Sequence, residues 1–112
     1  MTENFTNLVD MTRVFKLKDV ADYQEQSVVS REVIRKPNGT MTVFAFDKDE
    51  GLSEHTASFD AVVYILEGEA EIRIDGIPYV VKEGEMLIMP ANKPHALRAI
   101  TRYKNWLLYT SD

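Results

Sequence analysis

Cysteine is absent from the 112-residue sequence, so disulfide bonds and thiol chemistry are excluded, and a cytoplasmic location is expected. No stretch approaches the roughly 18 apolar residues that a membrane helix needs, and the polar start of the chain predicts no signal peptide. Basic residues are outnumbered, with 13 Lys and Arg against 18 Asp and Glu and a formal net charge of −5. Nucleic acids and anionic membranes are bound by basic patches, so neither is an expected partner.

Glycine is scarce as well, and each of the five glycines stands between apolar runs. Two belong to the pairs Asn38-Gly39 and Asp75-Gly76, which favour type I′ hairpins because both central residues of such a turn need a positive φ. Short runs with a glycine turn every 8 to 17 residues are typical of a β-sandwich or a small barrel. The length suits a single domain.

The runs between the turns are rich in β-branched and aromatic residues, which predicts strands. Two earlier strands are expected at 14–17 and 27–35, with one helical turn within 18–24 and Asp19 as its N-cap. The remaining predicted strands are 40–46, 60–66, 69–74, 78–81, 85–89, 96–100 and 105–110.

Some of these strands are apolar on both faces, as in 61–66 and 86–89. The outer face of such a strand must be covered by a second sheet or by a partner subunit, so a homodimer is expected. Tyr64 and Trp106 suit the dimer face, because interface cores favour aromatic residues. The sequence leaves open which face of 40–46 points inward.

Histidine is rarer still, and the first of only two stands in "EHTASFDAVVYILEGEAEI". His55, Ala57 and Ala61 are separated by even steps, so we expect them to share one strand face. The neighbouring acids Glu54 and Asp60 are then expected to point away from that face.

The second histidine, His95, stands in "GEMLIMPANKPHALRA". Pro90 ends a strand because it cannot donate to a ladder, and His95 opens the next one. Met89 precedes this turn and is expected to project inward, where its thioether is either core filler or a ligand for a soft ion.

These two segments resemble the paired motifs of the cupin superfamily. The resemblance implies an all-β fold, the double-stranded β-helix or jelly-roll barrel, with residues 12–112 as the cupin domain and residues 1–11 as an N-terminal extension. Asn92 replaces a motif glycine, a mild change because asparagine tolerates the left-handed conformation. The matching positions are His55, Gly68, Gly84, Pro90 and His95, and the departures are Ala57, Ala61, Asn92 and Ala99.

The resemblance also implies a metal site of three histidines and one glutamate, of which this chain keeps only His55 and His95. Two imidazoles are a poor site for a divalent metal ion, since catalytic zinc normally has three protein ligands. A metal cofactor at His55 and His95 is therefore an open question.

Two functions remain open after the sequence has been read. The first is a protein that binds a small molecule in the barrel at His55, Ala57, Ala61, Met89 and His95, with a weak or absent metal site. The alternative is a metal-dependent cupin enzyme, of the isomerase or dioxygenase type, whose coordination is completed by substrate or by another side chain. A metal-free enzyme with a histidine base is a variant of the second.

Overall fold

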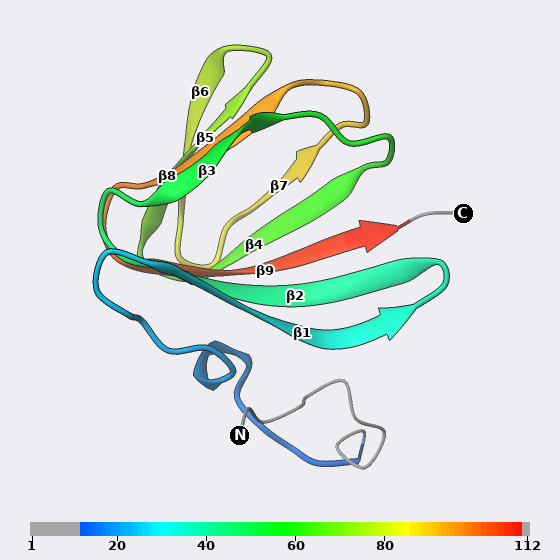
Figure 1. Cartoon of the computed structure of the whole chain (residues 1–112), viewed down its shortest axis with the longest axis vertical. Coiled ribbons are helices and arrows are strands. Elements are labelled where there is room, and N and C mark those ends of the chain that lie inside the picture. The colour runs from blue at the N-terminus through cyan, green and yellow to red at the C-terminus, as the bar shows by residue number, and fades with distance from the viewer. Residues whose placement is uncertain (1–11, 111–112) are drawn as a thin grey trace.

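The computed structural model describes residues 12–110, so the predicted N-terminal extension, residues 1–11, lies outside the described residues. The described chain forms nine β-strands in two antiparallel sheets (Figure 1). The strands are β1 (Val28–Lys36), β2 (Gly39–Phe46), β3 (Gly51–His55), β4 (Ala61–Glu67), β5 (Glu69–Ile74), β6 (Ile77–Lys82), β7 (Met86–Met89), β8 (His95–Ala99) and β9 (Tyr103–Thr110).

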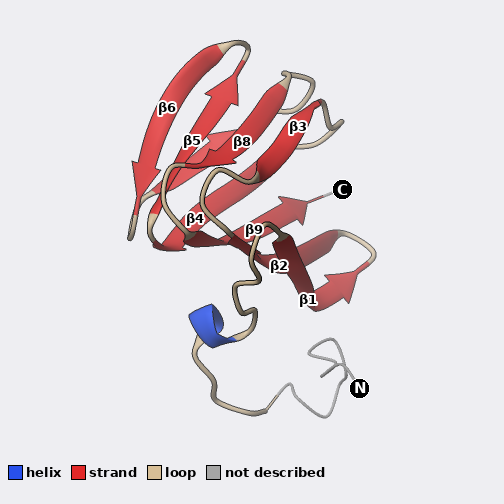
Figure 2. Cartoon of the chain, turned by 60° about the vertical axis from the view of Figure 1, so that its left-hand side comes forward, coloured by secondary structure: helices blue, strands red, loops and turns tan. Residues whose placement is uncertain are grey.

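The two sheets face each other as the layers of a jelly roll (Figure 2). The larger sheet has the strand order β1-β2-β9-β4-β7 and the smaller has β3-β8-β5-β6. The predicted jelly-roll fold is confirmed, although the two sheets do not close into a continuous barrel. No helix within residues 12–110 is long and apolar enough to cross a membrane.

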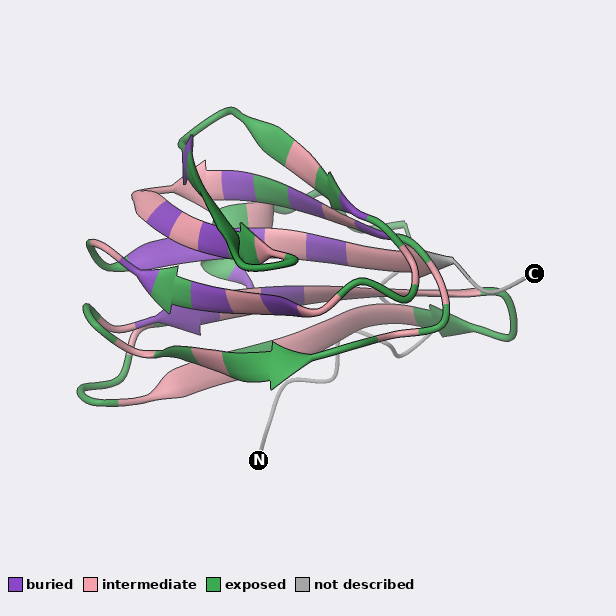
Figure 3. Ribbon diagram, turned by 90° about the horizontal axis from the view of Figure 1, so that it is seen from above, coloured by how far each residue is buried: buried purple, intermediate pink, exposed green. Residues whose placement is uncertain are grey.

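The core lies between the sheets because successive residues of a strand point to opposite faces (Figure 3). In β2 the inward residues are Phe44 and Phe46, which settles the face that the sequence left open. Phe46 stacks on Tyr103 of β9 with ring centroids 4.5 Å apart. Other buried residues of this core are Ala61, Val63, Ile65, Ala70, Ile72, Val81, Met89, Leu97, Ala99 and Leu107.

The opposite face of β2 is covered by the same chain. Val43 and Ala45 are buried against Val20 and Ala21, which follow the 3₁₀ turn η2 (Leu17–Asp19). The outer face of β2 is therefore covered by this N-terminal segment of the same chain.

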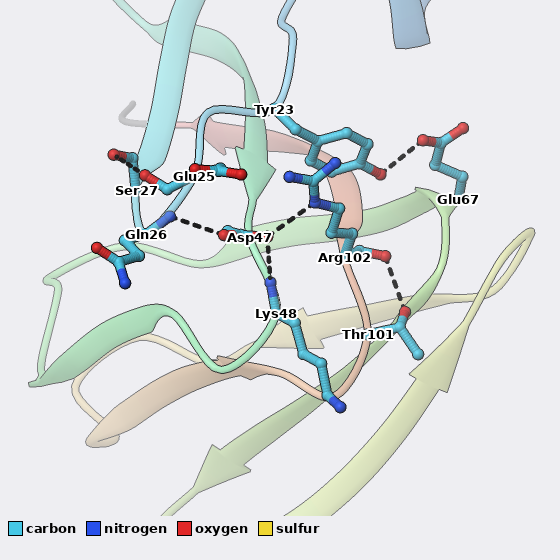
Figure 4. Close-up of polar contacts among 9 residues, drawn as sticks. All are labelled: Tyr23, Glu25, Gln26, Ser27, Asp47, Lys48, Glu67, Thr101 and Arg102. Atoms are coloured by element: carbon cyan, nitrogen blue, oxygen red, sulfur yellow. Dashed lines mark hydrogen bonds and ion pairs between the residues drawn. The ribbon is translucent and has the colours of Figure 1, made fainter.

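Polar contacts fasten the N-terminal segment to one end of the sandwich (Figure 4). The Tyr23 hydroxyl donates to Glu67 at 2.5 Å, and the Arg102 guanidinium lies over the Tyr23 ring. Arg102 also donates to Asp47 at 2.8 Å. Asp47 accepts a further bond from the Gln26 backbone N–H. The hydrogen bond from Arg102 is the main reason why the pKa of Asp47 falls to about 2, so this contact stays charged at neutral pH.

Two elements near the N-terminus differ from the sequence prediction. Residues 14–17 were expected to form a strand, but residues 14–16 have no regular structure and Leu17 begins η2. Asp19 is the last residue of η2 rather than its N-cap, and its backbone N–H donates to the Lys16 carbonyl. A strand needs a partner to satisfy its backbone, and the described chain offers none here.

The strand β3 was missed because it carries few strand-forming residues and four of its five residues are exposed. Within the described sheets it is an edge strand, paired with β8. At the far edge of the same sheet lies β6, which holds Pro78 and exposes Ile77 and Val80.

Candidate functional site

The two histidines meet at one end of the sandwich. His55 ends β3 and His95 begins β8, and the two are directly opposite in the register of these strands. Their Nε2 atoms lie 3.1 Å apart, and their ring centroids 4.3 Å. The two imidazoles therefore face each other as neighbours in one sheet.

The other ring nitrogen of each histidine is held by a backbone carbonyl. His55 Nδ1 lies 2.8 Å from the Ser53 carbonyl oxygen, and His95 Nδ1 lies 3.2 Å from that of Lys93. A carbonyl only accepts, so each Nδ1 carries the proton of a neutral ring. Two neutral rings would then direct their Nε2 lone pairs at each other, which is repulsive. This repulsion between the lone pairs is relieved when the two Nε2 atoms share a proton, a hydrogen-bond donor or a cation.

The two rings have different surroundings. His95 is buried, with 2% of its surface exposed, whereas His55 is exposed. Burial lowers the pKa of His95, and the nearby His55 lowers it further. A charged imidazole is thus disfavoured on the His95 side, which leaves its Nε2 as a hydrogen-bond acceptor.

Loop contacts fix the position of His95. Asn92 has a φ of 64°, the left-handed conformation predicted for a residue at a motif glycine. Its backbone N–H donates to the Ala57 carbonyl at 2.7 Å. One residue earlier, the Ala91 N–H donates to the Asp60 carboxylate at 2.8 Å. Asp60 is exposed, as expected, and it ties the β7–β8 loop to the β3–β4 loop.

A small cavity of about 10 Å³ lies beside the histidine pair, between the two sheets. That volume suits about one water molecule. Its walls are mostly apolar, but they also include one amide. The lining residues are Phe44, Leu52, His55, Met89, His95, Leu97, Asn105, Leu107 and Tyr109.

Asn105 is the unexpected member of this wall. It is 1% exposed, and its Oδ1 atom has no hydrogen-bond partner among residues 12–110. A buried acceptor without a partner costs free energy, so its presence needs a reason. Sequence reasoning missed Asn105 and Tyr109. The available signal was the two-residue period of β9, which puts Asn105 on the same face as the apolar Leu107.

The structure separates the other predicted site residues. Met89 is buried and lines the cavity, as expected of an inward side chain. Ala61 is buried at the start of β4, whereas Ala57 is half-buried in the loop between β3 and β4. Neither alanine belongs to the cavity wall. The expectation that His55, Ala57 and Ala61 share one strand face is wrong, because residues 56–60 interrupt the strand.

The fit of the site to a divalent metal ion is incomplete. Two nitrogens 3.1 Å apart can both bind one ion at the usual distance of about 2.0–2.1 Å, and histidine ligands commonly donate their other N–H to a carbonyl. The number of donors fails, since residues 12–110 contain no group of three or more His, Cys, Asp or Glu side chains placed to hold a metal. These residues do not fit a tightly held resident metal ion.

The comparisons with known proteins place the chain in a family. The model of the Cupin domain family matches residues 42–103, more than half of the chain, so the protein belongs to the cupin family. No match was found among curated proteins.

Solved structures from three bacteria are similar to the chain. A conserved protein of unknown function from Streptococcus pyogenes is 31% identical with a TM-score of 0.88, over 100% of this chain and 98% of that one. A cupin 2 conserved barrel domain protein from Leptotrichia buccalis is 41% identical with a TM-score of 0.84; the match covers 87% of this chain but only 47% of that protein. A cupin superfamily protein from Desulfitobacterium hafniense is 27% identical with a TM-score of 0.85, over 90% and 93% of the two chains.

Proposed function

We propose that this cupin binds a small molecule at the histidine end of the sandwich and holds a metal ion there weakly or not at all. The observation that supports the proposal is the approach of two Nε2 atoms to 3.1 Å while both Nδ1 atoms are engaged by carbonyls. A ligand N–H or O–H placed between the two lone pairs would relieve their repulsion. The ligand class is therefore a small molecule that offers a hydrogen-bond donor.

The size of the interior limits how such a ligand lies. The cavity beside the histidines accommodates about one water molecule. A larger body must stay at the open end, and only its donor group reaches His55 and His95. The unpartnered Oδ1 of Asn105 lines the same cavity and can accept a second hydrogen bond from that group.

One observation favours the alternative, a metal-dependent enzyme whose coordination shell is completed by its substrate. The carbonyl bonds to both Nδ1 atoms are the arrangement found behind metal-binding histidines. The chain would then contribute two neutral nitrogen donors, and the remaining donors would come from the substrate or from Met89.

The proposal extends to assembly and location. Tyr64, Met86 and Ile88 are 37%, 57% and 51% exposed on the outer face of the larger sheet, and a second copy of the chain is the proposed cover. A cytoplasmic location stays a prediction.

Elemental analysis and native mass spectrometry of the purified protein test the function. The proposal predicts less than stoichiometric metal and a bound organic molecule that is lost in both His55→Ala and His95→Ala. Lys82→Met, an exposed change on β6, serves as the control and should retain the molecule. Stoichiometric metal that disappears in the histidine variants would favour the enzyme instead. A ligand retained in both histidine variants would place the binding site elsewhere.

A further inference from the structure

Three hydrogen-bond acceptors border the cavity beside the histidine pair. His55 and His95 carry their ring protons on Nδ1, so each presents an Nε2 lone pair. The third acceptor is the buried Oδ1 atom of Asn105, which has no partner among residues 12–110. On β9, Asn105 lies between Tyr103 and Leu107, two core residues, so its side chain also points between the sheets.

The number of donors decides which chemical group can serve three acceptors. An alcohol donates one hydrogen bond and water donates two, so each leaves at least one acceptor unsatisfied. A primary ammonium group, the group at the end of a lysine side chain, has three N–H donors and no acceptor. Its head is close in size to the water molecule that the cavity accommodates. A primary ammonium group therefore matches the cavity in both donor number and size.

The surroundings of the cavity favour a cation. The chain carries a formal net charge of −5, and the described residues that line the cavity include no Lys or Arg. Phe44 and Tyr109 belong to the lining, and aromatic rings attract an ammonium group. Removing a charged group from water costs free energy, and hydrogen bonds from a charged donor, about twice as strong as neutral ones, offset that cost.

The register of the smaller sheet extends the histidine pair into a row of four residues. His55 is opposite His95, and His95 is in turn opposite Ile74 of β5. Ile74 is opposite Ile77 of β6. Figure 2 shows these four strands side by side in the order β3, β8, β5, β6. Directly opposite residues have their side chains on one face, and this face is the inward one because Ile74 packs against the core.

Ile77 ends this row, and it is 54% exposed although it faces inward. The larger sheet therefore leaves this end of the row uncovered. Adjacent strands lie about 4.8 Å apart, so Ile77 is roughly 10 Å from His95, within reach of an alkyl chain of about six carbons. Such a chain would cover Ile74 and Ile77 while its head group remains at the histidines.

We infer that the ligand of the histidine site is a primary alkylammonium ion. Its N–H groups bind His55, His95 and Asn105. Its alkyl chain lies along Ile74 and Ile77. This inference rests on the proposed function and deepens it, because it names both the donor group and the body of the ligand. Asn105 then distinguishes an ammonium group from an alcohol, and Ile77 distinguishes a long chain from a short one.

The probes are n-hexylammonium, 1-hexanol and hexyltrimethylammonium, titrated at pH 7.5, where an alkylammonium is charged because its pKa resembles that of lysine, about 10.4. Hexanol has a donor but no charge, and hexyltrimethylammonium has a charge but no donor. Hexylammonium should bind about tenfold more tightly than either and should shift the ¹⁵N resonances of both imidazoles. Asn105→Leu should reduce this preference to about threefold, whereas Tyr103→Phe, away from the cavity, should keep it.

A matched pair of variants in β6 tests the alkyl chain. Ile77 and Val80 are 54% and 55% exposed, but Val80 is opposite Glu71, on the other face of the sheet. Ile77→Ala should lower the affinity for hexylammonium about threefold and leave the affinity for methylammonium unchanged. Val80→Ala should change neither affinity.

Equal affinity for hexylammonium and hexanol, with imidazole shifts from both, would overturn the ammonium assignment and leave the proposed function standing. Equal affinity for hexylammonium and hexyltrimethylammonium would overturn it as well, because charge alone would then suffice. An effect of Val80→Ala as large as that of Ile77→Ala would refute the placement of the chain. If no probe shifts the imidazoles, the inference fails, whereas the fate of the co-purified molecule in His55→Ala and His95→Ala still decides the proposed function.

Discussion

Replacing Asn105 by leucine should make the protein more stable and a worse binder. Asn105 is 1% exposed, and its buried Oδ1 atom has no partner in the described part of the chain. Leucine branches at the same carbon and has no polar atom, so it removes the desolvation cost, and its larger methyl groups can fill the small cavity beside them. The cost of a buried unsatisfied acceptor is about 1–3 kcal/mol, and the free energy of unfolding should rise by about that amount.

Urea unfolding gives the magnitude directly, because a shifted midpoint with an unchanged m-value reports stability alone. The melting temperature should rise by about 4 °C for each kcal/mol in a chain of this size. Binding of the co-purified molecule should weaken in the same variant, since the acceptor in the cavity wall is gone.

Tyr103→Phe is the matched control. The buried Tyr103 hydroxyl likewise has no partner among the described residues, but Tyr103 does not line the cavity. Its removal should stabilise the protein and leave ligand binding unchanged. If Asn105→Leu instead destabilises the protein by more than about 1 kcal/mol, Oδ1 has a partner in solution. The assignment of Asn105 to the binding site would then be wrong.

Three further outcomes follow from the structure. Burial lowers the pKa of His95, so the free energy of unfolding should be greatest above about pH 6.5 and should fall as the pH drops from there through the folded pKa. Urea unfolding at pH 7.5 and 5.5 should show a smaller fall in His95→Gln than in the native protein. Ile88→Lys puts a charge on the outer apolar face and should convert the proposed homodimer to a monomer in light scattering, whereas a native protein that is already monomeric would contradict the assembly. Gly68→Ala should lower the free energy of unfolding by about 3 kcal/mol in a urea melt, because φ is +83° and a Cβ would lie 2.1 Å from the Arg102 carbonyl oxygen. Gly84→Ala, where φ is +84° but the space around a Cβ is open, should lower it by only about 1 kcal/mol.

The hairpins were the most predictable part of the fold, and the one difference from the predicted turns has a local cause. Asp75 and Gly76 have φ values of 56° and 81°, both positive, as the predicted type I′ turn requires. The β1–β2 hairpin also forms where expected, but its loop is Pro37–Asn38 rather than Asn38–Gly39. Proline fixes φ near −65°, so this loop cannot be the type I′ turn that the Asn-Gly pair favoured.

The histidine pair was predictable because the motif spacing carries it, whereas its surroundings were not. Strand periodicity cannot show where a strand is interrupted, so Ala57 was placed on a strand face that the loop removes. Asn105 and Tyr109 come from β9, distant in sequence, and only the pairing of β9 with β2 and β4 brings them to the site. Which residues share a cavity depends on such long-range pairing, and local sequence does not specify it.

The outer edge of the smaller sheet has a consequence for how the molecule meets its own copies. Exposed apolar edge strands act as templates on which a strand from another molecule can pair, and β6 exposes Ile77 and Val80 at such an edge. Pro78 lacks a backbone N–H, and an edge strand accommodates proline where the missing donor would have pointed to solvent. A strand from another copy would therefore lack one backbone hydrogen-bond donor at Pro78. Sheet extension is disfavoured at this point of the edge, so the proposed second copy would pack on the outer face of the larger sheet instead of extending this one.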